Sequence, residues 1–379
     1  MRIVVLGYIV RGPLGGMCWH HFQYVLGLKK LGHEILFLED SDDYSSCYNP
    51  LTMEMSKDPY YGLEFIKKLF NRFNVGDRWA YFDAHTNNWF GMNKQKVLSF
   101  CNQADIVFNL SAINPLRDWL KTIPSLVFID TDPLFTQVKI INDLNLKTLA
   151  NEHNSFFSFG ENINSSDCAI PVNGFNWKAT RQPIFLDAWK FSIPLPKAKW
   201  TTIMQWDSYK TQEYNGISYG MKSISFNDYM TLPEKSNDTF ELVMVSTKAP
   251  EALLLKSGWS LCNPEGVSLT PEDYQNYIQH SKGEWSVAKQ GYVISNSGWF
   301  SERSCAYLAS GRPVIIQDTG FSKFINTGKG LFSFSSLEDA IEAIEIVNSD
   351  YLNHCRYARE TVKEFFDSDK ILTELFNNL

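Results

Sequence analysis

The sequence predicts an α/β protein made of two doubly wound domains, each a parallel sheet with helices on both faces. Short apolar runs alternate with helical patterns along most of the chain, and this alternation is typical of parallel sheets. The chain has 379 residues, which is long for one core and favours two domains of ordinary size. Hydrophobic residues make up 44% of it, enough to exclude a disordered chain.

The first elements form a β-α-β unit. An apolar strand over 2–6 leads into a turn with Gly12, Gly15 and Gly16, then a helix, then a second apolar strand over 34–38. Acidic residues follow that strand, as in a dinucleotide site. A dinucleotide fingerprint, however, needs Gly-x-Gly-x-x-Gly, and these glycines have another spacing. Hydride transfer is therefore the disfavoured alternative.

The rest of the first half repeats the pattern. Strands are predicted over 106–110, 126–129 and 156–159, and helices over 61–73 and 94–101. The irregular stretch 40–60 is longer than an ordinary connection, so we expect a binding loop or lid there. Between residues 161 and 196 the chain becomes rich in Pro, Asn and Trp without periodicity, and we place the linker near 179–196.

The second half restarts the alternation after this linker. Its predicted strands and helices are, in order, strands over 200–206, 240–245, 285–288, 291–295 and 314–317, then helices over 337–347 and 351–366. We therefore expect domains over 1–180 and 197–350, followed by C-terminal helices over 351–379.

The most informative segment is 291–321, which predicts strand, turn, helix and strand in succession. The turn falls at Ser297-Gly298, Ser301 is a suitable N-cap, and Gly311 ends the helix. A turn of this kind aims backbone N–H groups at whatever lies above the strand ends, and an anion is the natural occupant. Arg303 in the first helical turn adds a cation.

This segment resembles the donor-site box of GT-B glycosyltransferases, in which a Gly-Trp or Gly-Gly turn, a short helix and a Gly-x-Pro-Val strand surround the diphosphate of a nucleotide sugar. The N-terminal order, Gly15-Gly16, a helix with an early histidine, then Gly32-His33-Glu34, is similar to the opening of the same enzymes. The likeness is to families 1 and 4. Asn296 stands where a histidine is usual, and family 4's paired glutamates are absent, so subfamily and stereochemistry stay open.

The resemblance implies two Rossmann-like domains facing a cleft, with the last helices crossing back to the first domain. It also implies transfer of a sugar from a nucleotide-sugar donor to an acceptor that the sequence does not identify. The residues expected to bind substrate are Gly15, Gly16, Lys222, Ser297, Gly298, Trp299, Ser301, Glu302, Arg303, Asp318, Thr319 and Gly320. Alternatives are a nucleotide-sugar epimerase of the same fold and a protein that binds a nucleotide sugar without turnover.

Several side chains could act as the base that takes the acceptor's proton. We rank His20 first, because it keeps the family spacing after Gly16 and an imidazole titrates near neutral pH. Its neighbour His21 should face away from the cleft if His20 faces it. Further candidates are Asp130 and Asp132, which end a predicted strand, and His153.

Asp130-Thr-Asp132 has the letters of the Asp-x-Asp motif of metal-dependent GT-A enzymes. No cluster has metal-ligand spacing, however, and we expect a metal-independent enzyme without a cofactor.

Composition bounds the partners and the compartment. A formal charge of −7 repels a phosphate backbone, so nucleic acid is an unlikely partner. Seven cysteines are scattered singly, as in reduced cytosolic proteins. The N-terminal apolar run is too short for a signal peptide, and no stretch has the length of a membrane helix. We expect a cytoplasmic protein.

Overall fold

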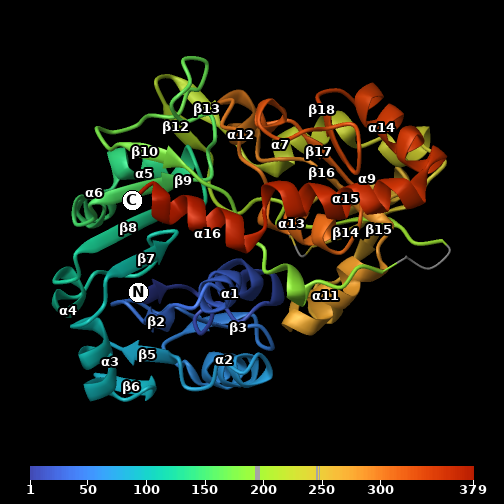
Figure 1. Cartoon of the computed structure of the whole chain (residues 1–379). Helices are drawn as coiled ribbons and strands as arrows, with labels where there is room; N and C mark the ends of the chain where they lie inside the picture. Colours follow the sequence, from blue (N-terminus) through green and yellow to red (C-terminus); the bar gives the residue numbers. More distant parts are fainter. Residues whose placement is uncertain (193–196, 245, 247) are drawn as a thin grey trace.

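The computed structural model describes residues 1–192, 197–244, 246 and 248–379. Two open sheets lie side by side, each flanked by helices (Figure 1). We call the parts that carry them the N-terminal and C-terminal domains. The predicted α/β class is confirmed. The predicted boundaries at 180 and 197 stay predictions, and residues 193–196 of the predicted linker, as well as residue 245 of a predicted strand, lie outside the described residues.

The N-terminal sheet has eight strands in the order β10-β9-β8-β7-β1-β2-β5-β6, and all neighbours pair in parallel except β5 with β6. Its central strands are apolar on both faces because helices cover both. The strands are β1 (Arg2–Leu6), β2 (Glu34–Asp40), β5 (Trp79–Asp83), β6 (Asn88–Gly91), β7 (Ile106–Leu110), β8 (Ser125–Asp130), β9 (Ser155–Ser158) and β10 (Trp177–Ala179).

Six helices accompany this sheet: α1 (Gly15–Lys30), α2 (Tyr60–Arg72), α3 (Lys94–Cys101), α4 (Asp118–Lys121), α5 (Phe135–Asn142) and α6 (Leu144–Asn151). The long connection expected over 40–60 contains a small hairpin, β3 (Cys47–Asn49) with β4 (Glu54–Ser56).

The C-terminal sheet has the order β15-β14-β11-β16-β17-β18, entirely parallel. Counted along this half of the chain, that is the 3-2-1-4-5-6 order of the Rossmann fold, whose direction reverses between β11 and β16. The strands are β11 (Trp200–Ile203), β14 (Phe240–Val243), β15 (Ser260–Cys262), β16 (Gly283–Ser286), β17 (Val314–Gln317) and β18 (Leu331–Phe334); a separate hairpin joins β12 (Gln212–Tyr214) and β13 (Ile217–Tyr219).

The helices of the C-terminal half are α7 (Lys222–Phe226), α8 (Leu232–Lys235), α9 (Glu251–Lys256), α10 (Glu265–Ser268), α11 (Pro271–His280), α12 (Gln290–Ile294), α13 (Glu302–Ala309), α14 (Leu337–Ser349), α15 (Tyr351–Phe365) and α16 (Ser368–Asn377). Among the described residues, no helix combines the length and the apolar character needed to cross a membrane.

The last helix returns to the N-terminal domain (Figure 1). α16 packs on α1 so closely that a Cβ added at Gly27 would lie 2.7 Å from Leu372 Cδ1. The Phe376 ring lies against those of Phe108 and His33. The end of the chain therefore braces the first domain.

The strand predicted over 291–295 is wrong. Residues 290–294 form the helix α12, and the strand of this region is β16, which begins at Gly283. The run Tyr292-Val293-Ile294 favours a strand by local propensity, but tertiary packing overrides it. α12 lies against α5 of the other domain, where a Cβ on Gly291 would be 2.5 Å from the Phe135 ring.

Candidate active site

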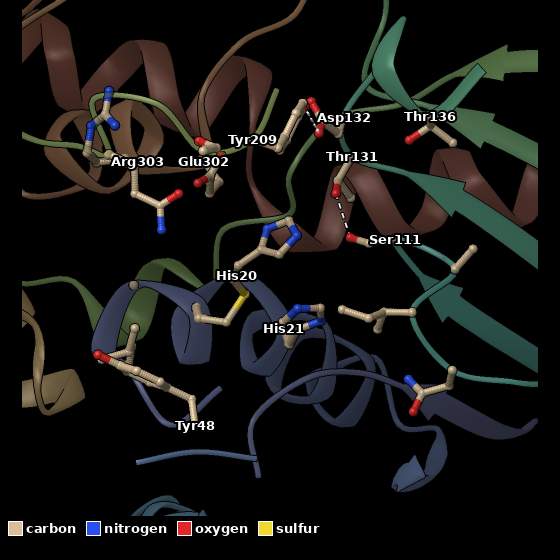
Figure 2. A pocket seen from close by; sticks show the side chains of 18 of the residues that line it. His20, His21, Tyr48, Ser111, Thr131, Asp132, Thr136, Tyr209, Glu302 and Arg303 are labelled. Carbon is tan, nitrogen blue, oxygen red and sulfur yellow. Dashed lines mark hydrogen bonds between the residues drawn. The ribbon is translucent and has the colours of Figure 1, made fainter. Parts of the chain in front are cut away.

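A cavity of about 2050 Å³ lies between the domains (Figure 2). α1 and the loops after β7 and β8 supply one wall, and the loops after β11 and β16 and the start of α13 supply the other. We call this cavity the cleft. It lies at the carboxyl ends of strands from both sheets, where open α/β sheets bind their ligands.

Arg303 marks the point where the C-terminal sheet reverses direction. Ser301 caps α13 as predicted, its hydroxyl accepting the Arg303 N–H at 3.3 Å. The guanidinium then reaches back to the sheet, donating to the Ile203 carbonyl at 2.8 Å and the Ser286 hydroxyl at 3.0 Å. It also pairs with the buried Glu284 carboxylate. Because Ile203 ends β11 and Ser286 ends β16, these contacts hold Arg303 at the cleft's floor.

Lys222 is a second cation on the same wall. It begins α7, is only 8% exposed, and lines the cleft. Its ammonium makes no hydrogen bond or ion pair with any residue that the structure describes. Burial and the nearby Arg303 charge hold the pKa of Lys222 well below its usual range, while Glu284 and Glu302 act in the opposite direction. A buried ammonium without a partner is costly, and an anionic ligand would supply one.

The turn before α13 has another role than the sequence predicts. The Gly298 N–H donates to the Thr319 carbonyl at 2.7 Å, and the Ser297 N–H donates to the Tyr292 carbonyl at 3.1 Å. A Cβ on Gly298 would lie 2.8 Å from the Asn162 nitrogen of the N-terminal domain. Neither Ser297 nor Gly298 lines the cleft. The prediction that their N–H groups are free for a phosphate is wrong, because the turn packs between the domains.

Asp318, Thr319 and Gly320 also stand away from the cleft. The Asp318 carboxylate accepts the Gly320 N–H at 2.8 Å and the Ser322 hydroxyl, so it caps its own turn. The Thr319 hydroxyl donates to the Trp299 carbonyl at 2.6 Å. The sugar-binding role predicted for these residues is not supported, since their polar groups brace the turn before α13.

Trp299, Glu302 and Gly16 do line the cleft, as predicted, while Gly15 lies behind it. The Trp299 ring stacks on Tyr292, with centroids 4.3 Å apart, and its Nε1–H donates to the Thr131 carbonyl of the other domain at 3.2 Å.

His20 projects into the cleft from the second turn of α1, between Glu302 and His21 in Figure 2. Burial lowers its pKa, and the effect outweighs the opposing influence of Glu302 and of a hydrogen bond to Gln182. The imidazole is therefore neutral near pH 7 and can accept a proton.

The expectation that His21 faces away is wrong. Both rings line the cleft, in edge contact with centroids 4.7 Å apart, because the cleft wraps around the first turns of α1. His21 is 1% exposed and its Nδ1 has no hydrogen-bond partner among the described residues. Burial, reinforced by His20 and Arg11, holds the pKa of His21 well below its usual range.

The other candidate bases are engaged in the structure. Asp130 is fully buried outside the cleft and accepts from Gln137 at 2.8 Å and Ser158 at 2.6 Å. His153 is likewise outside it, beside Leu149 and Asn109. Neither can reach an acceptor.

Asp132 lines the cleft, but side chains of the C-terminal domain compensate its negative charge. Its carboxylate accepts from Lys289 Nζ at 2.9 Å and from the hydroxyls of Tyr209 and Tyr292. Burial would raise the pKa of Asp132, but Lys289 and the two hydroxyls outweigh it and lower the pKa. Asp132 is thus a poor base. Sequence reasoning missed the roles of Lys289 and both tyrosines, since nothing in their spacing signals a contact with Asp132.

Glu39, near the end of β2, also has a structural role. The Glu39 carboxylate accepts the N–H groups of Ile9, Val10 and Arg11 at 2.7–2.8 Å and pairs with the Arg11 guanidinium. In a dinucleotide site this acid would bind a ribose. Here the N–H groups of the protein's own loop take up the Glu39 carboxylate, so it is not free to bind a ribose. This further disfavours hydride transfer.

No protein-family model and no curated protein matches the sequence. Solved structures do match over the full length. An α-glucosyltransferase in complex with UDP and a 13-mer DNA containing an HMU base aligns with a TM-score of 0.61 at 11% identity, covering 100% of this chain and 98% of that one. HepE of Anabaena, in complex with UDP and glucose, gives 0.54 at 14%, covering 100% of both chains. Sucrose-phosphate synthase of Thermosynechococcus elongatus gives 0.54 at 10%, covering 100% and 98%. Matched end to end across two Rossmann-like domains and the cleft between them, this chain has the GT-B fold.

Proposed function

We propose that this protein is a glycosyltransferase that uses a nucleotide-sugar donor. One observation carries the proposal: a single cleft has two cations, Lys222 and Arg303, on one wall and a neutral histidine, His20, on the other. Two of the similar structures, the α-glucosyltransferase and HepE, are complexes with UDP, which supports testing uridine nucleotides first.

The chemistry divides between the two walls. The bond from the anomeric carbon to a phosphate oxygen breaks, and negative charge grows on the leaving diphosphate, where Lys222 and Arg303 stabilise it. The acceptor oxygen bonds to the anomeric carbon and gives its proton to His20. Lys222, together with the Arg303 guanidinium that is paired with Glu284, would supply positive charge beside the diphosphate, so we propose a metal-independent reaction.

The net charge bears on the class of acceptor, and the cysteines bear on the compartment. Several similar structures are complexes of an α-glucosyltransferase with DNA. For this chain the net charge of −7 makes a nucleic-acid acceptor unfavourable. The cysteines are all free thiols in the structure, which supports a reducing compartment such as the cytoplasm.

The test begins with a panel of uridine, guanosine, adenosine and thymidine diphosphates and their sugars. A bound donor raises the melting temperature by mass action, and slow release of free sugar shows that the anomeric bond breaks. Wash-in of solvent isotope at a sugar carbon without hydrolysis would indicate an epimerase, and binding without turnover would indicate a binder. An unchanged melting temperature across the panel would contradict the proposal.

His20→Ala tests the base. We expect turnover to fall about 10²-fold or more, with donor affinity unchanged, by loss of general-base catalysis. The acid limb of the pH–rate profile should disappear with it. If His21→Ala is the inactive variant and His20→Ala retains activity, the base is assigned to the wrong histidine.

A further inference from the structure

The segment between β10 and β11, which we call the joining segment, places the side-chain amide of Gln182 against His20. Gln182 follows β10, is 1% exposed, and does not line the cleft. Its Nε2 donates to the carbonyls of His20 and Pro183, each at 3.1 Å. Since a carbonyl oxygen can only accept, these two bonds fix which end of the amide is nitrogen. The Oε1 atom must therefore be the end that faces the imidazole.

This orientation determines where His20 carries its proton. His20 Nδ1 lies 2.6 Å from Gln182 Oε1. An amide oxygen has no hydrogen to give, so Nδ1 must be the donor. A neutral imidazole has one N–H, which leaves the lone pair on Nε2. The second hydrogen bond of Gln182, to the His20 carbonyl, ties the same amide to the helix that carries the ring.

We infer that Gln182 is a positioning residue that holds His20 in the Nδ1–H tautomer and so keeps Nε2 as the atom that accepts the acceptor's proton. The inference rests on the proposed function for the role of that proton, while the tautomer itself follows from the hydrogen bonds alone. Gln182 acts through His20 and contacts no substrate.

The choice of an amide over a carboxylate has a consequence for charge. The titratable groups that face His20 are His21 on its own helix and Glu302 at the start of α13, and neither hydrogen-bonds to it. A carboxylate in place of Gln182 would fix the same tautomer but would favour the imidazolium ion. A neutral amide fixes the tautomer without adding a charge, and burial then keeps the pKa of His20 low and the ring unprotonated.

Gln23 provides a matched control. It lies one turn further along α1, is equally buried, and also bonds to the joining segment, where its Oε1 accepts from the Phe185 N–H and Trp189 Nε1–H, each at 3.0 Å. It makes no hydrogen bond to His20. Replacing it removes contacts between the same two elements without touching the imidazole.

The experiment compares Gln182→Met, Gln182→Glu and Gln23→Met in the full-length protein. Nitrogen-15 NMR of the histidine side chains reports the tautomer without substrate. In the wild type and in Gln23→Met we expect the Nδ1–H form of His20; in Gln182→Met a mixture of both forms. Gln182→Glu should retain Nδ1–H and move the acid limb of the pH–rate profile to higher pH.

Turnover supplies the second readout. Gln182→Met should lower kcat about tenfold or more, part of the 10²–10⁴-fold that a general base supplies, with KM for the donor unchanged. An unchanged tautomer in Gln182→Met, the same tautomer loss in Gln23→Met, or wild-type kcat in Gln182→Met would each overturn the inference. If the wild type transfers no sugar while the NMR pattern is as expected, the proposed function fails and the hydrogen-bond assignment stands.

Discussion

Lys222 shows how a functional residue can work against stability. The cleft wall buries most of the Lys222 side chain, its ammonium has no hydrogen-bond or ion-pair partner in the described part of the chain, and the nearby Arg303 charge adds repulsion. Both costs disappear when an anion binds. The free protein therefore has an unfavourable electrostatic interaction at Lys222. Its relief contributes to the free energy of donor binding.

We expect Lys222→Met to make the free protein more stable and a weaker binder. Removing the buried charge should raise the free energy of unfolding by about 1 kcal/mol, the lower end of what apolar replacement of buried charges gives. Affinity for UDP should fall about tenfold or more, since a charge-assisted bond contributes about 1.5–3 kcal/mol. Denaturant titration and calorimetry measure the two effects. The exposed Lys210 gives the control, Lys210→Met, which should change neither.

His153 predicts the pH dependence of stability. Burial lowers its pKa from 6.5 to about 4, and its ring bonds to the Leu149 carbonyl and the Asn109 amide. Below pH 6.5 the His153 imidazole of the unfolded chain binds a proton, whereas that of the native state does so only below about pH 4. The free energy of unfolding therefore falls as the pH falls through this window.

The loss from His153 amounts to about 2 kcal/mol between about pH 7 and about pH 5. His153→Gln, which retains a polar side chain, should remove that share of the pH dependence in urea unfolding. Equal pH slopes for the variant and the wild type would contradict the assignment.

Single residues were predictable where local spacing sets their position. The interval from Gly16 to His20 placed the histidine on the first turns of α1, and the N-cap at Ser301 placed Arg303 at the start of α13. Asp132 and Lys289 meet across 157 residues of sequence, and no local pattern reports such a pairing. The neutral partner of His20, Gln182, lies 162 residues away and was missed for the same reason.

Elements were predictable where periodicity and caps agree. The helix predicted over 94–101 has those bounds in the structure, with the Asn93 side chain as its N-cap. No strand is predicted from the sequence for β5 (Trp79–Asp83) or β6 (Asn88–Gly91). β6 lies at the sheet's edge and has four residues, whereas β5 has five and pairs on both sides. The role of the turn before α13 could not be predicted from its sequence. The sequence is suited to phosphate binding, but in the structure the N-terminal domain packs against the turn.

Gly15 and Gly16 predict how closely α1 and α11 must approach. A Cβ on Gly15 would lie 2.3 Å from the Thr270 carbonyl oxygen, which is backbone and cannot turn aside. A Cβ on Gly16 would lie 3.1 Å from the Tyr274 ring, which can move slightly. Gly15→Ala should therefore cost about 1–3 kcal/mol of stability, as overpacking does, and lower turnover by separating the cleft's walls.

Gly16→Ala is the matched variant for that prediction, with an expected cost below about 1 kcal/mol. Thermal or urea unfolding of the two proteins, with assays of sugar transfer, decides the matter. Equal stability of both variants would mean that α1 and α11 do not meet in solution as they do here.

At the scale of the whole molecule, the two domains are joined by polar contacts across the cleft. Trp19 Nε1 donates to the Pro271 carbonyl at 3.0 Å, and Trp299 Nε1 to the Thr131 carbonyl at 3.2 Å. A third contact is the ion pair of Asp132 with Lys289, whose ammonium also lies 4.9 Å or less from the ring centroids of Phe135 and Tyr209. A carboxylate of one domain thus meets a cation and aromatic rings gathered from both.

Lys289→Met should loosen this closed arrangement. Without the ammonium, the half-buried Asp132 carboxylate keeps its two tyrosine hydroxyls but loses the charge that compensates it, so opening the cleft to water becomes favourable. We expect the radius of gyration from X-ray scattering to rise in the free variant and to return toward the wild-type value with UDP.

A double-mutant cycle with Asp132→Asn isolates the ion pair, because the coupling free energy of unfolding excludes whatever each substitution does alone. We expect about 1–3 kcal/mol of coupling, the range for residues in direct contact within one network. Lys139→Met is the control: Lys139 is exposed and lies over the same Tyr209 ring, at 5.1 Å, without an ion pair among the described residues. Lys139→Met should leave the radius of gyration unchanged. Its own double-mutant cycle with Asp132→Asn should give no coupling free energy. A wild-type radius of gyration for Lys289→Met, together with a cycle that gives no coupling, would mean that apolar contacts hold the domains together. Asp132, Lys289 and the two tyrosine hydroxyls would then act in ligand binding instead.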